Sequence, residues 1–228
     1  MRRYLLALAA AVLATAAFAG VAHATGNSSS CVSAADATFH HTFDGAGGSA
    51  TITAVRPLCD GEERTFSLVS YTTPVFVYDS DRALIDSGRR SVTLSVDVPA
   101  CETRVEAFLG AGIIEEPTTG YGDLTLGSPG SRSSGVAGSY KGGDAECAPE
   151  PSVTFRSYCD GVLHTRLSNA ADATVDAVFT VDGRLKRVAP GKHADLTSHP
   201  SGPVVVRDNT LTTSTGSWVD PADCPPAA

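Results

Sequence analysis

Hydrophobic and polar residues alternate along most of the chain with a period of two. One run spans residues 38–43 and a second spans 50–54, with the sequence DGAGG between them. Successive side chains of a strand point to opposite faces, so this period predicts strands with one buried face. Two such runs around a glycine-rich turn predict a β-hairpin.

Further alternating runs follow in both halves of the chain. They lie at 66–68, 74–78, 92–98, 105–109, 153–155, 163–167, 175–181, 204–206 and 211–219. Asp182-Gly183 has the sequence typical of a type I′ hairpin turn. Only Ser80 to Asp86 could form a turn of helix. Short strands joined by polar turns are typical of β-sandwiches, and their spacing after residue 152 is typical of an immunoglobulin-like domain.

The beginning of the chain has the pattern of a secretory signal peptide. Arg2 and Arg3 form a basic start, residues 4–21 are apolar, and Ala22-His23-Ala24 fits the small-x-small cleavage rule. A membrane anchor is the alternative, but the run is mostly alanine and no basic flank follows it. We therefore predict cleavage after Ala24. The sequence leaves the Sec and twin-arginine export routes both open.

These patterns predict an all-β protein with two antiparallel β-sandwich domains after the signal peptide. The signal peptide would occupy residues 1–24, the first sandwich 31–109 and an immunoglobulin-like second domain 152–224. Residues 110–151 hold ten glycines and a serine-rich stretch. A structureless segment of that length is uncommon inside a compact domain. We expect it to be a loop or linker that is tied to the first domain.

The charge of the chain excludes two classes of partner. The formal net charge is −8, and cleavage after Ala24 removes two arginines and no acid, which leaves −10. Nucleic acids and anionic membranes attract basic surfaces, so neither is an expected partner. No second apolar stretch is long enough to span a bilayer, so no membrane segment is expected after signal cleavage.

All six cysteines follow the predicted signal peptide, and their even number indicates disulfides in a secreted protein. None forms a C-x-x-C pair, so neither a zinc knuckle nor a thioredoxin-like site is indicated. The sequence CDG occurs at 59–61 and again at 159–161. Asp-Gly turns the chain readily, so we interpret both copies as the same structural corner rather than as reactive thiols.

The pairing of the cysteines is one choice among fifteen. A cut within 110–151 leaves three cysteines in each half, so either one bridge joins the halves or Cys147 belongs to the first. We favour the second arrangement. It pairs Cys31 with Cys147, Cys59 with Cys101, and Cys159 with Cys224.

Several stretches resemble a known group of proteins. PLCDGEERTFSLVSYTTP at 57–74 and RRSVTLSVDVPAC at 89–101 are similar to the N-terminal domain of secreted proteins of high-GC Gram-positive bacteria. SYCDGVLHTRLSN at 157–169 and WVDPADC at 218–224 resemble the immunoglobulin-like module that follows it in many of them. The resemblance covers nearly all of the chain after the signal peptide and carries over no catalytic residues.

Many members of this group resemble cell-wall proteins with a sortase-sorted LPxTG tail. The stretch LTTSTG at 211–216 lacks the proline and is not followed by an apolar tail. We therefore expect a secreted, extracellular protein, either released or held at the cell wall without a covalent bond.

No motif for catalysis, cofactor binding or metal binding occurs, so catalytic, cofactor and metal residues are predicted as none. G-x-S-x-G, H-E-x-x-H and phosphate-loop patterns are absent from the sequence. His40 and His41 should point to opposite faces of a strand, with His41 either a pH-sensitive buried group or a tolerated half-buried one.

Two groups of acidic residues come closest to a site. Asp79, Asp81 and Asp86 lack the glycine and glutamate of a calcium loop, so a solvated turn is expected there. Glu115-Glu116 could supply half of a glycosidase pair, but such pairs are defined by their separation in space.

Aromatic residues offer the best predicted binding surface. Exposed aromatic rings on a sandwich face can stack on sugars or anchor a protein. The candidates are Tyr71, Phe76, Tyr78 and Tyr121.

Three functions remain open for this chain. We expect a non-catalytic binding or adhesion protein of the cell exterior, with an unidentified protein or polysaccharide as partner. An accessory protein that binds cell-wall or environmental polysaccharide is the alternative. A secreted hydrolase would need a cleft with paired carboxylates or a Ser/His pair, which the sequence alone does not reveal.

Overall fold

The chain folds into β-strands. The computed structural model describes residues 31–199, 201–222 and 224, and among them it has four sheets, two one-turn 3₁₀-helices and no α-helix. The predicted all-β class is therefore confirmed. The predicted signal peptide at 1–24 lies outside the described residues. Within them, no helix is both long and apolar enough to cross a membrane.

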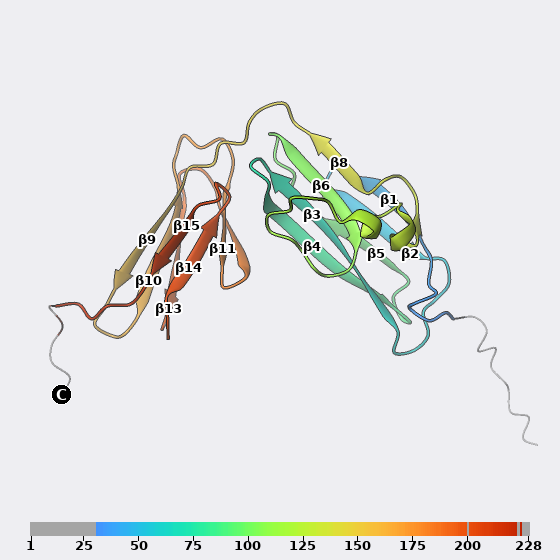
Figure 1. Cartoon of the computed structure of the whole chain (residues 1–228), viewed down its shortest axis with the longest axis horizontal. Helices are drawn as coiled ribbons and strands as arrows, with labels where there is room; N and C mark the ends of the chain where they lie inside the picture. The colour runs from blue at the N-terminus through green and yellow to red at the C-terminus, as the bar shows by residue number, and fades with distance from the viewer. Residues whose placement is uncertain (1–30, 200, 223, 225–228) are drawn as a thin grey trace, which may run out of the picture.

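The first domain consists of two four-stranded sheets that face each other (Figure 1). Their strand orders are β5-β2-β1-β7 and β4-β3-β6-β8. Neighbouring strands are antiparallel except for β1 and β7. The elements are β1 (Phe39–Asp44), β2 (Ser49–Ala54), β3 (Glu63–Thr72), β4 (Phe76–Asp86), β5 (Ser91–Ser95), β6 (Thr103–Leu109), η1 (Gly122–Leu124), η2 (Pro129–Ser131), β7 (Ser133–Ser134) and β8 (Ser139–Gly142).

The second domain has a three-stranded sheet of order β13-β10-β9 and a four-stranded sheet of order β12-β11-β14-β15. Its strands are β9 (Pro151–Ser157), β10 (Leu163–Asn169), β11 (Ala177–Val181), β12 (Arg184–Val188), β13 (His193–Ser198), β14 (Val204–Asp208) and β15 (Thr213–Gly216). If the two-residue strand β7 is set aside, both domains place their first, second and fifth strands in one sheet. The third, fourth, sixth and seventh strands form the other, so the two domains share one topology.

The two CDG corners have the same local shape but different places in that topology. Gly61 and Gly161 have φ values of +80° and +78°, in the region that favours glycine. The first corner lies between the second and third strands of its domain, and the second between the first and second. The repeated letters therefore mark a recurring turn and not a duplicated position in the fold.

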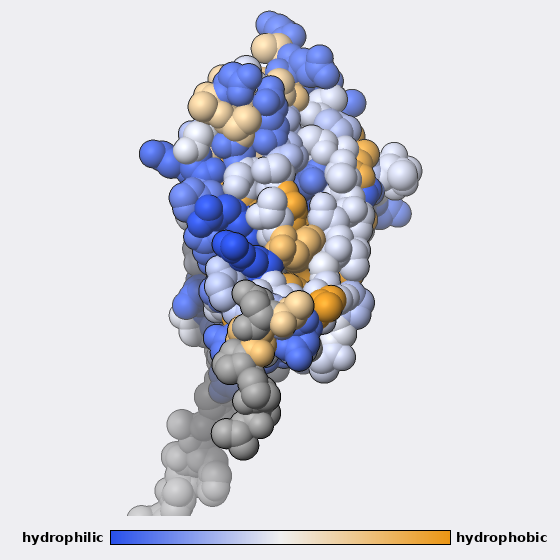
Figure 2. Space-filling view, turned by 90° about the vertical axis from the view of Figure 1, so that its left-hand side faces the viewer, coloured by the Kyte–Doolittle hydropathy of each residue, from blue (hydrophilic) through white to orange (hydrophobic). Residues whose placement is uncertain are grey.

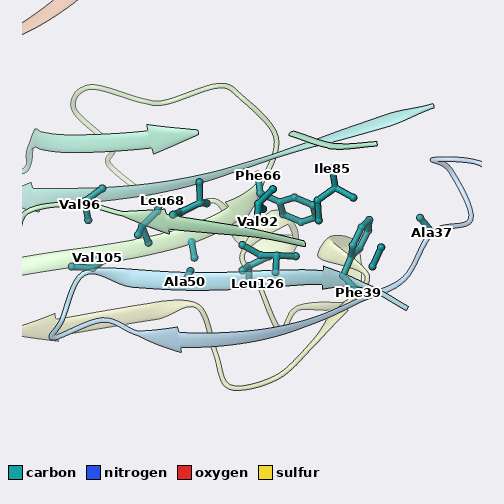
Figure 3. Packing of buried hydrophobic residues seen from close by; sticks show 14 of the residues in the cluster. Ala37, Phe39, Ala50, Phe66, Leu68, Ile85, Val92, Val96, Val105 and Leu126 are labelled. Atoms are coloured by element: carbon teal, nitrogen blue, oxygen red, sulfur yellow. The ribbon is translucent and has the colours of Figure 1, made fainter. Parts of the chain in front are cut away.

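The core of the first domain lies between its two sheets (Figure 3). Ile52 on β2 and Leu94 on β5 come from one sheet, and Phe66 on β3 comes from the other. The rings of Phe39 and Phe66 meet edge to face with centroids 4.8 Å apart, a favoured geometry for aromatic pairs. The buried positions alternate along β2 and β5, as their period of two predicts.

Of two local predictions, one is confirmed and the other is wrong. Asp182 and Gly183 join β11 to β12 with φ values of +50° and +70°, and the type I′ hairpin predicted there is confirmed. Ser80 to Asp86, the one stretch considered for a helical turn, belongs instead to the long strand β4. It pairs with β3 over its length, so the helical alternative is wrong.

The segment 110–151 contributes strands to the first domain. β7 pairs with β1 and β8 pairs with β6, while the one-turn helices η1 and η2 lie between β6 and β7. Main-chain hydrogen bonds also join Leu126 to Ala107 and to Gly138. These hydrogen bonds fix a glycine-rich stretch whose own sequence has little strand pattern.

All six cysteines form disulfides, and two of the three predicted pairings are wrong. Cys159–Cys224 is confirmed, but Cys31 pairs with Cys59 and Cys101 with Cys147. In both corrected pairs, two main-chain segments that run side by side bring the cysteines together. The segment before β1 bridges Val32 to Leu58, next to Cys59. The end of β8 runs beside β6, where Glu102 donates to the carbonyl of Ala145.

The acidic cluster on β4 ties together the edges of the two sheets of the first domain. Asp81 Oδ2 accepts a hydrogen bond from the amide of Ser95 at 3.0 Å, and Asp79 Oδ2 accepts one from the amide of Asp97 at 2.8 Å. Asp86 Oδ1 accepts from the amides of Gly88 and Arg89 in the turn that follows β4. These carboxylates therefore hold main-chain amides, which accounts for the acidic cluster.

We predict that Asp81→Ala lowers the free energy of unfolding by about 1–2 kcal/mol, because a charged acceptor of a main-chain amide is lost. Urea unfolding of the purified protein measures this change. Asp172→Ala is the control, since Asp172 is exposed and its side chain has no hydrogen bond among the described residues. Equal midpoints for the two variants would contradict the role given to Asp81.

Candidate functional site

The aromatic residues predicted to form an exposed surface lie instead between the two domains. Tyr71, Phe76 and Tyr78 are buried, with exposed fractions of 1%, 0% and 7%, and Tyr121 is half-buried. Val175 and Val178 of the second domain belong to the same apolar cluster. The expected exposure is wrong because a loop of the first domain that holds Ile114 and Tyr121, together with residues of the second domain, covers this part of β3 and β4.

A loop of the first domain is held over the same sheet by hydroxyl groups. The Tyr71 hydroxyl donates to the carbonyl of Ile114 at 2.9 Å and lies 2.8 Å from the Tyr121 hydroxyl. The Tyr121 ring stacks on Phe108. Burial raises the pKa of both tyrosines. These contacts use the polar atoms of both rings internally.

Ion pairs fasten the second domain to the first. The Arg187 guanidinium donates to Asp97, lies 4.0 Å from an Asp79 oxygen and sits 5.1 Å from the centre of the Tyr78 ring. Arg207 binds Glu116 through two hydrogen bonds of 2.7 and 3.0 Å. This pairing lowers the pKa of the Glu116 carboxyl. The candidate glycosidase carboxylate therefore belongs to the domain contact.

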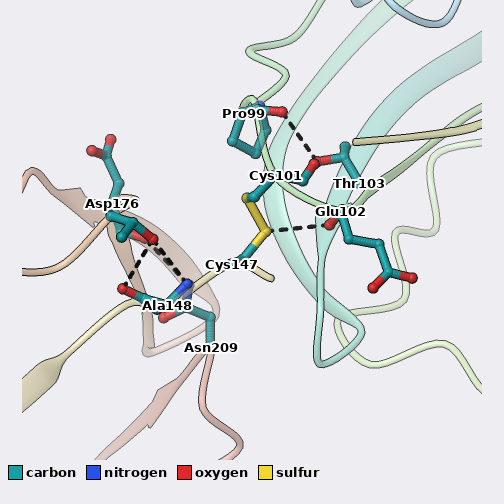
Figure 4. Close-up of a disulfide and its surroundings, with 9 residues drawn as sticks. Pro99, Cys101, Glu102, Thr103, Cys147, Ala148, Asp176 and Asn209 are labelled. Carbon is teal, nitrogen blue, oxygen red and sulfur yellow. Dashed lines mark hydrogen bonds between the residues drawn. A yellow bond between two sulfur atoms is a disulfide. The ribbon is translucent and has the colours of Figure 1, made fainter. Parts of the chain in front are cut away.

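The connection between the domains is short, and it is bonded to both of them. Cys147 is bonded to Cys101 of the first domain, and the next residue, Ala148, exchanges hydrogen bonds with Thr174 of the second. Figure 4 shows this disulfide with Asp176 and Asn209 of the second domain on the far side of Ala148. The disulfide on one side of Ala148 and the two Thr174 hydrogen bonds on the other restrict rotation between the domains.

Two histidine–serine pairs pin the glycine- and serine-rich segment to β1. His41 Nδ1 lies 2.6 Å from Ser133 Oγ, and its Nε2 lies 2.6 Å from the carbonyl oxygen of Val136. A carbonyl only accepts, so Nε2 carries the proton and Nδ1 accepts from the serine hydroxyl. His41 is thus buried, not half-buried, and both of its ring nitrogens are hydrogen-bonded.

The second pair, His40 Nδ1 with Ser134 Oγ at 2.6 Å, is exposed. A serine–histidine pair needs a third group that orients the base. Within the described parts of the chain, no carboxylate hydrogen-bonds to His40. No cluster of three or more His, Cys, Asp or Glu side chains there could hold a metal ion either. The pair therefore joins β7 to β1.

The outer face of β9, β10 and β13 carries the most developed array of exposed functional groups. Cross-strand pairing sets Arg156 beside His164 and Thr197, and sets Thr154 beside Arg166 and Asp195. Tyr158 follows β9 directly. Together these residues line an open hollow of about 460 Å³. We call this face the platform, and its members are Thr154, Arg156, Tyr158, His164, Arg166, Asp195 and Thr197.

The aromatic ring of the platform is presented to solvent. Tyr158 is 40% exposed, and its ring lies 4.3 Å from the imidazole of His164, centre to centre. The Arg156 guanidinium lies 5.7 Å from the centre of the same Tyr158 ring. Trp218 donates its indole N–H to the carbonyl of Tyr158 at 2.9 Å, which fixes the main chain that carries the ring.

Sequence reasoning missed this platform. No role was assigned to His164 or Tyr158 from the sequence, and Tyr158 directly precedes the second CDG corner. The available signal was the outward alternation of Thr154, Arg156 and Tyr158, continued by His164 and Arg166 on the next strand.

No protein-family model matches the chain, and no curated protein matches it in sequence. Its function therefore has to be inferred from its own residues.

The domain contact gives a pH prediction. Burial raises the pKa of Tyr78 to about 12, whereas an unfolded chain releases this proton near pH 10. The folded state therefore binds the proton more tightly, so the contribution of Tyr78 to stability is complete below about pH 10. It is lost as the pH rises towards about 12.

We expect the free energy of unfolding to fall over this pH range and to fall less in Tyr78→Phe. Urea unfolding measured at several pH values tests this, with Tyr158→Phe as the control outside the contact. An unchanged slope in Tyr78→Phe would show that the tyrosine does not titrate as the buried contact requires.

Proposed function

We propose that this chain is a secreted, non-catalytic binding protein of the cell exterior. Its four sheets are interpreted as two β-sandwich domains, the second of them immunoglobulin-like. The strand orders support this interpretation, because sheets of three and four antiparallel strands with the middle strands crossing between them are typical of such sandwiches.

Three observations support export to the exterior. The three disulfides are typical of proteins that fold in an oxidising compartment. The first 24 residues have the composition of a signal peptide. The resemblance to secreted proteins of high-GC Gram-positive bacteria has the same implication. The protein is then released or held non-covalently at the cell wall.

The platform on the second domain is the proposed ligand surface, and one observation carries this assignment. Tyr158, 40% exposed, is the only Phe, Tyr or Trp of the described chain that is exposed rather than buried or half-buried. Burying aromatic rings is the general rule, so an exposed ring beside Arg and His side chains marks a contact surface. The other aromatic candidates are taken up by the contact between the domains.

The chemistry of this surface favours a saccharide over an apolar protein partner. A tyrosine ring stacks on the flat apolar face of a sugar, while Thr and Asp side chains hydrogen-bond its hydroxyls. The outer side of the second domain is mostly hydrophilic, with hydrophobic residues in a central strip and in smaller separate groups (Figure 2). A broad apolar patch of the kind that marks protein docking is not seen on this side.

We predict that Tyr158→Ala weakens saccharide binding at least tenfold, about 1.4 kcal/mol, because the stacking ring is lost. Affinity electrophoresis of the secreted chain through gels that contain soluble plant, fungal or bacterial polysaccharides gives the measurement. Val205→Ala is the matched control, since Val205 is 47% exposed on the other sheet of the same domain.

Retardation of the wild type that survives in Tyr158→Ala would contradict the platform as the binding surface. Absence of retardation by every polysaccharide would contradict the saccharide assignment itself. In both cases circular dichroism confirms that the variant is folded.

A further inference from the structure

The platform carries two arginines on an acidic protein. Arg156 lies on β9, while His164 and Arg166 lie on β10, and Asp195 is the one carboxylate among its lining residues. The complete chain has a formal net charge of −8. Positive side chains on one face can attract an anionic ligand locally even where the net charge of the chain is negative.

The two arginines of the platform differ in whether a carboxylate binds them. Arg166 is bound by Asp195 through two hydrogen bonds, 2.8 Å from Nε and 3.1 Å from an Nη atom. This pairing lowers the pKa of the Asp195 carboxyl. His193 lies 3.7 Å from the same carboxylate. The positive charge of Arg166 is therefore already matched within the protein.

Arg156 has no such partner. Within the described residues its guanidinium makes no hydrogen bond or ion pair, and its one specific contact is with the Tyr158 ring. It is exposed, its strand-pairing neighbour is His164, and Thr197 lies beyond His164 in the same row, so this row holds no carboxylate. Its planar fork of N–H donors matches the two oxygens of a carboxylate.

We propose that the platform binds an acidic saccharide whose carboxylate is held by Arg156 and whose sugar ring stacks on Tyr158. This inference rests on the proposed function, since it specifies the charge of a ligand at the same face. The Arg166–Asp195 pair lies on the neighbouring row of the sheet, where its oxygens and N–H groups can bind hydroxyls of the adjoining sugar. The ligand class is thus a uronate-bearing polysaccharide.

The geometry supports an extended chain rather than a single sugar. Neighbouring strands lie about 4.8 Å apart, so the three strands present a surface roughly 10 Å wide between their outermost main chains. Tyr158 and Arg156 lie at the β9 side of this surface, and Asp195 and Thr197 lie at the β13 side. A linear polysaccharide that crosses the strands contacts both sides.

Isothermal titration of the secreted chain with an oligogalacturonide tests the inference. The matched probe is the same oligosaccharide after reduction of its carboxylates to alcohols. We expect the acidic form to bind about tenfold more tightly than the reduced form, and Arg156→Gln to abolish this difference. Arg156→Lys keeps the charge without the fork and should retain part of it. Arg184→Gln, an exposed arginine on β12, is the control.

The outcomes separate this inference from the proposed function. Equal binding of both probes, with no effect of Arg156→Gln but a loss in Tyr158→Ala, overturns the acidic ligand and supports the binding face. Tighter, Arg156-dependent binding of poly(ribitol phosphate) would replace the carboxylate with a phosphodiester and overturn the uronate assignment. Failure of all three probes to bind, together with no polysaccharide retained in gels, overturns both proposals.

Discussion

The structure depends on the way in which the second domain is fixed against the first. Arg187 reaches from β12 to two carboxylates of the first domain and covers the Tyr78 ring. The apolar cluster beneath it draws side chains from both domains. On either side of Ala148, the Cys101–Cys147 disulfide and the Thr174 hydrogen bonds leave almost no free linker. One rigid contact thus decides which faces of each sheet remain available to a ligand.

The consequence is a division between the two sheets of the second domain. Residues of β11 and β12, in the four-stranded sheet, contribute to the domain contact through Val178, Leu185 and Arg187. The three-stranded sheet takes no part in those contacts, and β9 and β10 lie on the side away from the first domain (Figure 1). An exposed tyrosine and an arginine without a carboxylate partner remain on that free sheet. The exposure of these two side chains to solvent is the reason for proposing the platform as a binding face.

The sequence predicted those features that depend on neighbours along the chain. Alternation located β2 and β5, because each buries one face, and Asp182-Gly183 located a hairpin because only certain residues accept positive φ. Features that depend on distant partners were missed. Cys31 was assigned to Cys147 because nothing local indicates that the segment before β1 runs beside Leu58. Tyr78 was expected at the surface because an apolar face covered by another domain has the same pattern as an exposed one.

The candidate site was also missed because its residues come together only through strand pairing. His41 meets Ser133 only after β7 pairs with β1, 92 residues away in the chain. The platform likewise requires three strands in register before Arg156, His164 and Thr197 form one row. Each residue is ordinary by itself, since a single exposed Arg or Tyr carries no signal. Only the sheet makes them a common surface, and no periodicity in the sequence encodes which strand lies beside which.

The central claim is that the outer face of β9, β10 and β13 is the binding surface. The most direct test is to map chemical-shift changes in the ¹⁵N-labelled secreted chain during titration with an oligogalacturonide. The account predicts that the changes gather at residues of these three strands and at Tyr158, while amides at the domain contact stay unmoved. Changes centred on the domain contact or on the first domain, with the three strands silent, would contradict it.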